Sequence, residues 1–371
     1  APTAAFAGVF TQNAFPGAPI LLGRELLSRP LSRGVLINNK VANVGGPTAL
    51  ADARALQSAA AAIFGAPAHE FFVASTGIIG WSLPVKPMTE ALPGLADQLQ
   101  SHSVLGLAEG IMTTDSYPKV RSRSLFGGRI VAVAKGAGMI EPNLGTMLVY
   151  ILTDLEVSRS ALRDILSRVA AKTFNAISVD GDQSTSDMAL IFSSQRFPCP
   201  DQKAFERALE DVCRELAVDI VRNGEGTAHV LEVRVKGGQD EAQARLVAKA
   251  IVNSPLVKTA VFGNDPNVGR VLSAVGDVLG NAGKTLERSR LKLSIADQVV
   301  FDGGVFRLDP QKEKALSDAF RAAALPEKKT YPPHENNVVF EVVLAPEGSD
   351  AVVWGSDLSY EYVRENADYR S

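Results

Sequence analysis

The sequence predicts an α/β fold. Segments typical of strands alternate with segments typical of helices along the chain, which is the pattern of this class. The composition agrees, because 46% of the 371 residues are hydrophobic and 21% are charged, close to the globular average. A disordered chain would be poorer in apolar residues. The length is sufficient for a sizeable core, in two domains or one large one.

The first clear helix and strand follow each other closely. Residues 48–64 are rich in alanine and predict a helix, with Thr48 as its N-cap and Gly65 just past its end. Residues 71–75 predict a short strand, which runs into a turn at Thr76-Gly77.

The remaining segments continue the alternation. Apolar residues at helical spacing predict helices, and alternating or continuous apolar runs predict strands. Paired prolines predict a loop at 328–337. The expected helices are 158–172, 201–222, 240–252 and 267–279, and the expected strands are 129–134, 147–153, 230–235, 256–262, 291–301 and 338–344.

Charge and cysteine content narrow the function classes. The net charge of −3 gives no basic excess for binding nucleic acid by bulk charge. Two cysteines cannot build a disulfide framework, and Cys213 is expected as a buried thiol in its helix. No apolar run reaches the roughly 18 residues of a membrane span, and the first residues lack the basic start of a signal peptide. We therefore expect a cytoplasmic protein, or one of the mitochondrial matrix in a eukaryote, that binds neither membrane nor nucleic acid.

The sequence motifs of several common binding and catalytic sites are incomplete or absent. Gly283-Lys284-Thr285 resembles the end of a phosphate loop, but Val278 stands where that loop needs a glycine. Gly136-Ala137-Gly138 lacks the third glycine of a dinucleotide fingerprint. No Gly-x-Ser-x-Gly elbow is present. The histidines pair with no cysteine or carboxylate at metal spacing, so no metal is expected; they are His69, His102, His229 and His334.

Residues 135–150 form the most informative segment. A Gly-rich loop that carries Lys135 leads to Gly145-Thr146, where a buried strand begins. A threonine hydroxyl can attack the preceding carbonyl, and hydrolysis of the resulting ester leaves Thr146 as a new N-terminus. Its own α-amine, with a pKa of about 7.7–8.0, can then act as base for its hydroxyl. From this segment alone, an ordinary junction between loop and strand is the favoured interpretation, because it is the commoner case.

Short sequence blocks spread over nearly the whole chain favour self-cleavage before Thr146 over an ordinary junction. In their order they resemble the ornithine acetyltransferases, also called bifunctional glutamate N-acetyltransferases, a family that cleaves itself before a threonine. The blocks that carry the resemblance are residues 9–13, 75–80, 112–115, 135–148, 179–182, 224–226, 264–267 and 366–371.

The resemblance implies an architecture. Mixed sheets layered with helices would form a fold of the N-terminal-nucleophile type with a smaller C-terminal part. Cleavage between Gly145 and Thr146 would give an alpha subunit of residues 1–145 and a beta subunit of residues 146–371. Within the beta subunit, 146–280 would be the main part and 281–371 the smaller one. The two products would stay together and pair with a second copy, as a heterotetramer.

The resemblance also implies roles for individual residues. Thr146 would be the nucleophile, and Thr76 and Gly77 would form the oxyanion hole, which binds the charge that develops on the acetyl oxygen. The substrate would be bound by a further set of residues. In this set Lys135 would pair with the α-carboxylate and Glu225 with the ornithine ammonium, and the complete set is Thr113, Lys135, Thr146, Glu225, Asn366 and Ser371.

The implied reaction is a ping-pong transfer of the acetyl group from N2-acetylornithine to glutamate, in arginine biosynthesis. An acetyl-threonine ester carries the activation, so no cofactor is expected, although some members of the family use acetyl-CoA as a second donor. Two alternatives stay open. The protein could act on another N-acylated amino acid or as an amidohydrolase, or it could be a catalytically silent binding protein of the same fold.

Five positions depart from the pattern of the family. Asn39 and Lys40 replace a Ser-Gly pair, which adds bulk and charge. Gln183 replaces a common threonine, His229 a lysine and Val268 a tryptophan. These changes bear on the choice of donor and acceptor more than on the chemistry.

Overall fold

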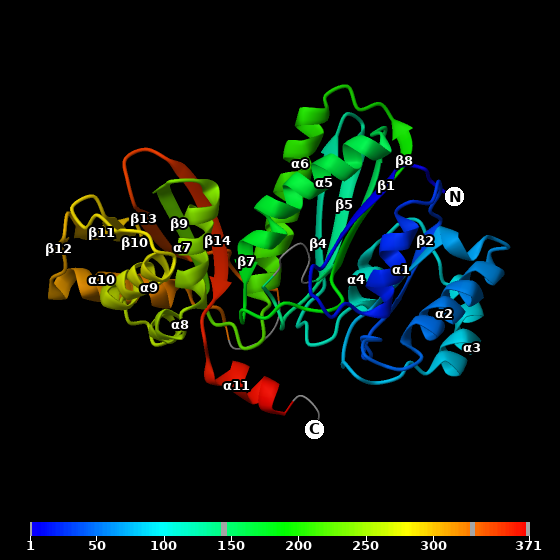
Figure 1. Ribbon diagram of the computed structural model, residues 1–371, viewed down its shortest axis with the longest axis horizontal. Helices are drawn as coiled ribbons and strands as arrows, with labels where there is room; N and C mark the ends of the chain where they lie inside the picture. The colour runs from blue at the N-terminus through cyan, green and yellow to red at the C-terminus, as the bar shows by residue number, and fades with distance from the viewer. Residues whose placement is uncertain (1, 142–146, 327–330, 369–371) are drawn as a thin grey trace. The chain divides into compact units, whose positions relative to one another are not determined.

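The computed structural model describes residues 2–141, 147–326 and 331–368 (Figure 1). The chain packs into two compact units. Unit 1 consists of Ala1–Asn175 and Asp182–Ile220, and unit 2 of Ala176–Gly181 and Val221–Ser371. Each unit combines helices with sheet, which confirms the predicted α/β class. The expected subunit boundary falls within the range of unit 1, and the expected boundary at 280/281 falls within unit 2.

Unit 1 is built on a five-stranded mixed sheet in the order β1-β8-β6-β5-β4. Its strands are antiparallel except for the parallel pair β6 and β8. Helices α5 and α6 lie along this sheet (Figure 1) and present apolar faces that are buried. The bounds are β1 Phe6–Phe10, β4 Lys119–Leu125, β5 Gly128–Lys135, β6 Leu148–Leu155, β8 Met188–Phe197, α5 Arg159–Lys172 and α6 Gln202–Arg222.

A smaller layer of unit 1 holds a parallel two-stranded sheet, β2 (Gly34–Asn38) and β3 (Phe71–Ser75). All five residues of β3 are buried, as its apolar sequence suggests. Helix α2 (Ala49–Ile63) begins after Thr48, the predicted cap, although the Thr48 hydroxyl donates to Asp52 instead of accepting from the backbone. The other helices are α1 Ala18–Leu26, η1 Ala68–Glu70, α3 Val85–Ala96, α4 Leu105–Gly110 and η2 Phe174–Ala176.

Unit 2 is built on a seven-stranded mixed sheet in the order β12-β11-β10-β13-β9-β14-β7. Its apolar core is formed by the strands together with helices α7 to α10. The strands are β7 Ile177–Ser178, β9 Val230–Gly238, β10 Lys292–Ile295, β11 Gln298–Asp302, β12 Val305–Phe306, β13 Val338–Val343 and β14 Ser349–Ser356. The helices are α7 Glu241–Asn253, α8 Pro255–Phe262, α9 Val268–Asn281, α10 Pro310–Ala323 and α11 Tyr360–Ala367.

Two predicted strands are wrong. Residues 256–262 form helix α8, because the Ser254 hydroxyl caps the N–H of Val257 and Pro255 occupies the first helical turn. Residues 291–301 form two strands, β10 and β11, joined by a tight turn. Ala296 and Asp297 make that turn with φ of 44° and 62°, the left-handed geometry of a two-residue hairpin.

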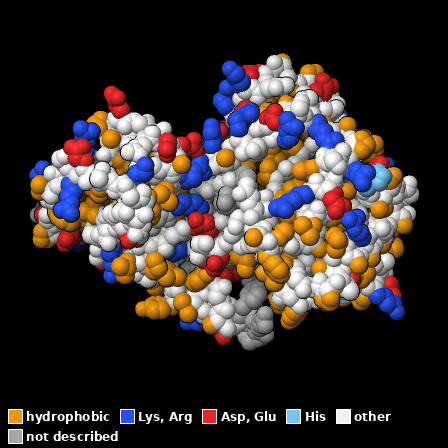
Figure 2. Space-filling view, viewed as in Figure 1, with side chains coloured by type: hydrophobic (Ala, Val, Ile, Leu, Met, Phe, Trp, Pro, Cys, Tyr) orange, Lys and Arg blue, Asp and Glu red, His pale blue; other side chains and the backbone are white. Residues whose placement is uncertain are grey.

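The other predicted helices and strands are confirmed to within a few residues at their ends, and residues 328–330 of the predicted loop lie outside the described residues. Three helix starts have the expected chemistry, because Ser158, Asp240 and Asn267 each accept a backbone N–H at the cap. Cys213 is fully buried, as predicted. Acidic and basic side chains are interspersed in the view of Figure 2, in keeping with the small net charge. Within the described part of the chain, no helix is long and apolar enough to cross a membrane.

Candidate active site

The predicted oxyanion residues lie directly after the buried strand β3. The Thr76 N–H donates to the carbonyl of Asn38 at 3.1 Å, and the Thr76 side chain is largely buried. Gly77 has φ of +125°, and a Cβ there would lie 2.2 Å from the carbonyl carbon of Lys40. Only glycine fits this close approach of two backbone segments. The next residue, Ile78, donates its N–H to the Lys40 oxygen at 2.9 Å, which fixes the turn.

Asn39 and Lys40, which depart from the family pattern, belong to the backbone segment that approaches the turn at Gly77. Lys40 is exposed and has φ of 73°, a left-handed conformation that suits the glycine common in the family. The Asn39 amide donates to the carbonyls of Gly110 and Met112, at 3.2 Å each. Asn39 therefore links the oxyanion turn to the segment that leads into Thr113.

A buried carboxylate organises the Thr113 segment. Asp115 accepts the Thr113 N–H on Oδ2 at 3.0 Å, and the Gly136 N–H on Oδ1 at 2.9 Å. Its Oδ1 also lies 2.5 Å from the ammonium of Lys119, and both side chains are 0% exposed. The sequence analysis missed this centre, because spacing alone does not reveal that an aspartate and a lysine are both buried.

The ionisation of Asp115 follows from these contacts. Burial would raise its pKa, but the Lys119 ammonium, the charge of Lys135 and the Gly136 N–H lower it, and the pKa falls from 3.8 to about 2. Burial also lowers the pKa of Lys119, against the opposing attraction of Asp115. Because the aspartate stays ionised at neutral pH, its charge offsets that of the buried lysine.

Lys135 ends strand β5 at the edge where β6 and β8 begin. It pairs with Leu148 of β6, which in turn pairs with Met188 of β8. The Met188 N–H also donates to the Met147 carbonyl at 3.0 Å, so the chain enters β6 at this edge. Gly145 and Thr146, the expected cleavage site and nucleophile, lie outside the described residues.

A second buried acid, Asp187, precedes β8 at the same edge. It is 4% exposed, and its Oδ2 has no hydrogen-bond partner in the described part of the chain. Burial raises its pKa well above the usual value, while a hydrogen bond with Ser184 and the charge of Lys135 act in the opposite direction. The sequence analysis missed Asp187 as well, although it lies near one of the family blocks.

Unit 2 brings together two of the predicted substrate residues. The Asn366 amide, on helix α11, donates to Glu225 Oε2 at 2.9 Å and to the Tyr362 carbonyl at 3.0 Å. The Ser359 hydroxyl donates to the Gly226 carbonyl at 2.6 Å, so the start of α11 is fastened to the segment that carries Glu225. Ser371 lies outside the described residues.

The three other positions that depart from the family pattern, His229, Val268 and Gln183, each have a defined environment in the structure. His229 is 2% exposed, and its Nδ1 lies 2.7 Å from Asp357 Oδ2. Asp357 also accepts the Ala228 N–H at 2.9 Å, so it fixes the chain just after the Glu225 segment. Val268 is buried in the core of unit 2, and the Gln183 carbonyl accepts the Asn13 amide at 3.0 Å.

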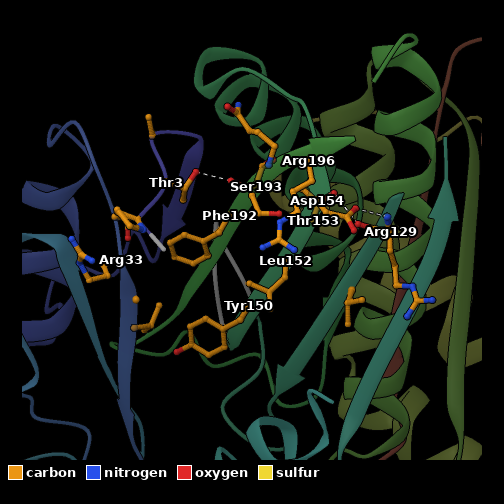
Figure 3. Close-up of a pocket in the computed structure, with 18 of the residues that line it drawn as sticks. Thr3, Arg33, Arg129, Tyr150, Leu152, Thr153, Asp154, Phe192, Ser193 and Arg196 are labelled. Atoms are coloured by element: carbon orange, nitrogen blue, oxygen red, sulfur yellow. Dashed lines mark hydrogen bonds between the residues drawn. The ribbon is translucent and has the colours of Figure 1, made fainter. Parts of the chain in front are cut away.

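A cavity of about 820 Å³ lies elsewhere in unit 1 (Figure 3). Strands β5, β6 and β8 contribute Arg129, Tyr150 and Arg196 to its lining, and the N-terminal segment contributes Thr3. None of the predicted site residues that the structure describes is among those that line it. Within the described residues, no group of three or more His, Cys, Asp or Glu side chains is placed to hold a metal ion.

Comparison with known proteins gives consistent matches. The model of the ArgJ family matches residues 1–371. The arginine biosynthesis bifunctional protein ArgJ of Methylococcus capsulatus is 39% identical over 380 residues, covering 99% of this chain and 88% of the relative. The glutamate N-acetyltransferase of Methanopyrus kandleri is 36% identical over 375 residues, covering 99% and 93%. A crystal structure of argJ from Bacillus halodurans is 33% identical, with a TM-score of 0.53, and covers 60% of this chain and 100% of its own.

Proposed function

Because the chain belongs to the ArgJ family, we propose that it transfers the acetyl group of N2-acetylornithine to glutamate in arginine biosynthesis. The observation that carries this proposal is the match of the family model from residue 1 to residue 371. The name of the Methanopyrus kandleri relative supports the reaction, and the name of the Methylococcus capsulatus relative supports the pathway.

The proposed chemistry has two steps through one ester. The Thr146 hydroxyl attacks the acetyl carbonyl of the donor and passes its proton to the α-amine. The bond between the acetyl carbon and N2 then breaks, N2 takes up the proton, and ornithine leaves. In the second step the amine of glutamate attacks the acetyl-threonine ester, and the bond between the acetyl carbon and the threonine oxygen breaks. The threonine oxygen takes up the proton that the amine loses, and N-acetylglutamate leaves. Thr76 and Gly77, in their fixed turn, would stabilise the negative oxygen in both steps.

Substrate recognition is proposed for groups in each unit. In unit 1, Lys135 would pair with the α-carboxylate, since no described acid forms an ion pair with its ammonium. Thr113, held by Asp115, would contact the same substrate. In unit 2, Glu225 would bind the side-chain ammonium of ornithine, with Asn366 orienting the carboxylate.

We also propose cleavage between Gly145 and Thr146. The matched Bacillus halodurans chain covers 60% of this sequence and is itself matched over its whole length. Residues 146–371 make up a similar share of the 371-residue chain, so the matched chain has about the size of the expected C-terminal product. The word bifunctional in the names of relatives denotes a second activity of those proteins, and acetyl-CoA stays a proposed second donor for this chain.

The test is a product analysis. Purified protein is incubated with N2-acetylornithine and glutamate, and ornithine, N-acetylglutamate and acetate are quantified. Acetyl transfer predicts equal amounts of ornithine and N-acetylglutamate. A product mixture dominated by acetate would show an amidohydrolase instead, and no turnover of N2-acetylornithine would favour a binding protein.

A further inference from the structure

We propose that Asp115 is a positioning residue, which sets Lys135 and the Thr113 segment in place for the α-carboxylate of the amino-acid substrate. This inference rests on the proposed function, and it adds a residue that touches no substrate. It is carried by three contacts of one buried carboxylate, all within unit 1.

The contacts join two segments that are far apart in the sequence. Oδ2 accepts the N–H of Thr113, two residues earlier, and Oδ1 accepts the N–H of Gly136, which directly follows Lys135. Lys119, the third donor, begins β4 and pairs with Ala134 of β5. Asp115 therefore fixes the backbone beside both proposed substrate residues, at the point where β5 ends and regular pairing stops.

The charges of Asp115 and Lys119 also help to keep Lys135 in place for the substrate. Lys119 is buried and lies close enough to Lys135 for the two like charges to interact. Asp115 neutralises Lys119, which leaves Lys135 as the positive charge available to a carboxylate. Without Asp115, the buried ammonium would repel Lys135, and the N–H groups of Thr113 and Gly136 would both lose their acceptor.

The test compares ligands with and without the carboxylate. Ornithine and putrescine share the chain of methylenes and a terminal ammonium, but putrescine has no carboxylate. Their dissociation constants are measured by calorimetry for the wild-type protein and for Asp115→Asn, Lys119→Met and the double variant Asp115→Asn/Lys119→Met. The double variant removes the ammonium that the first would leave buried and unpaired. Glu70→Gln is the matched control, because Glu70 is another buried acid of unit 1, paired with Arg33.

Positioning predicts a selective loss. In Asp115→Asn and the double variant, ornithine should bind about tenfold more weakly, which equals about 1.4 kcal/mol, while putrescine binding stays unchanged. Lys119→Met keeps both backbone contacts but leaves the Asp115 charge unpaired beside Lys135, so it should keep part of the preference for ornithine. Glu70→Gln should keep all of it.

Other outcomes overturn the proposal. Equal weakening of both ligands would show a general structural effect, and unchanged ornithine binding would show that Asp115 positions nothing. Loss of the preference in Lys119→Met would assign the effect to the charge pair alone. A wild-type protein that binds ornithine but transfers no acetyl group would refute the proposed function. The binding constants of the variants would still decide whether Asp115 positions Lys135. A wild-type protein that does not prefer ornithine over putrescine would refute the role given to Lys135 and Asp115 together.

Discussion

Replacing Gly77 by alanine tests the structure and the chemistry of the oxyanion turn together. The new Cβ would lie 2.2 Å from the Lys40 carbonyl carbon and 2.3 Å from its oxygen, distances at which backbone must move. Strain at φ of +125° adds about 1–3 kcal/mol, and the forced shift about 1–3 kcal/mol more. We therefore expect a loss of about 2–6 kcal/mol in the free energy of unfolding.

The chain offers a matched control three residues away. Gly80 also has positive φ, of 86°, but a Cβ there would meet nothing within 4 Å. Gly80→Ala should therefore lose only about 1–2 kcal/mol, the cost of the left-handed backbone, and the difference between the variants isolates the contact with Lys40.

The assays are denaturant unfolding and acetyl transfer. Misplacing one oxyanion donor should lower kcat of Gly77→Ala by about 10²–10³-fold, while Gly80→Ala stays within a few fold of the wild type. Two results would refute the reasoning. The two variants could lose equal stability, which would mean that Lys40 makes no close approach, or Gly77→Ala could keep full activity in a folded protein.

Three further predictions concern stability. Lys40→Gly relieves a left-handed lysine and should raise the free energy of unfolding by about 1 kcal/mol in denaturant titrations, whereas a decrease would show that its side chain matters more than its backbone. Because the pKa of Asp115 is lowered to about 2, its ionised form stabilises the folded state by about 2 kcal/mol above pH 3.8, and this should be lost as the pH falls toward 2. The difference in unfolding free energy between wild type and Asp115→Asn should therefore shrink below about pH 4, and a constant difference would contradict the ion pair. The raised pKa of Asp187 has the opposite effect on stability, since its folded form holds a proton more tightly than the unfolded form and loses stability as the pH rises. Asp187→Asn should therefore gain stability relative to wild type from pH 4 to pH 8. Melting temperatures that stay parallel across that range would contradict this prediction.

The sequence predicted the α/β class and several helices and strands, because apolar periodicity reports which face of an element is buried, but it gave no prediction for others such as β1, β8 and α10. In helix α7 the buried residues recur at helical spacing, and in strand β3 all five residues are buried. The periodicity failed at α8, a short apolar run whose helical state depends on Ser254 and Pro255 at its start. It also failed at Ala296-Asp297, where no glycine or asparagine announces the hairpin turn.

The site was predictable only in part. Glu225 and Asn366 are 141 residues apart, and their proximity was expected from the family resemblance, not from any local pattern. The burial of Asp115 with Lys119 could not be predicted, because charged residues are seldom buried and the partner is chosen by tertiary packing. The same holds for Asp187, whose environment is created by the start of β6 and by Lys135.

The most direct test of the central claim is the intact mass of the denatured protein after mixing with N2-acetylornithine. We predict two chains, residues 1–145 and 146–371, and a C-terminal chain that is heavier by one acetyl group on Thr146. Adding glutamate should remove that acetyl group, and Thr146→Ala should give one uncleaved chain that takes up none. An uncleaved wild-type chain, or a stable acetyl group on any residue other than Thr146, would contradict the account.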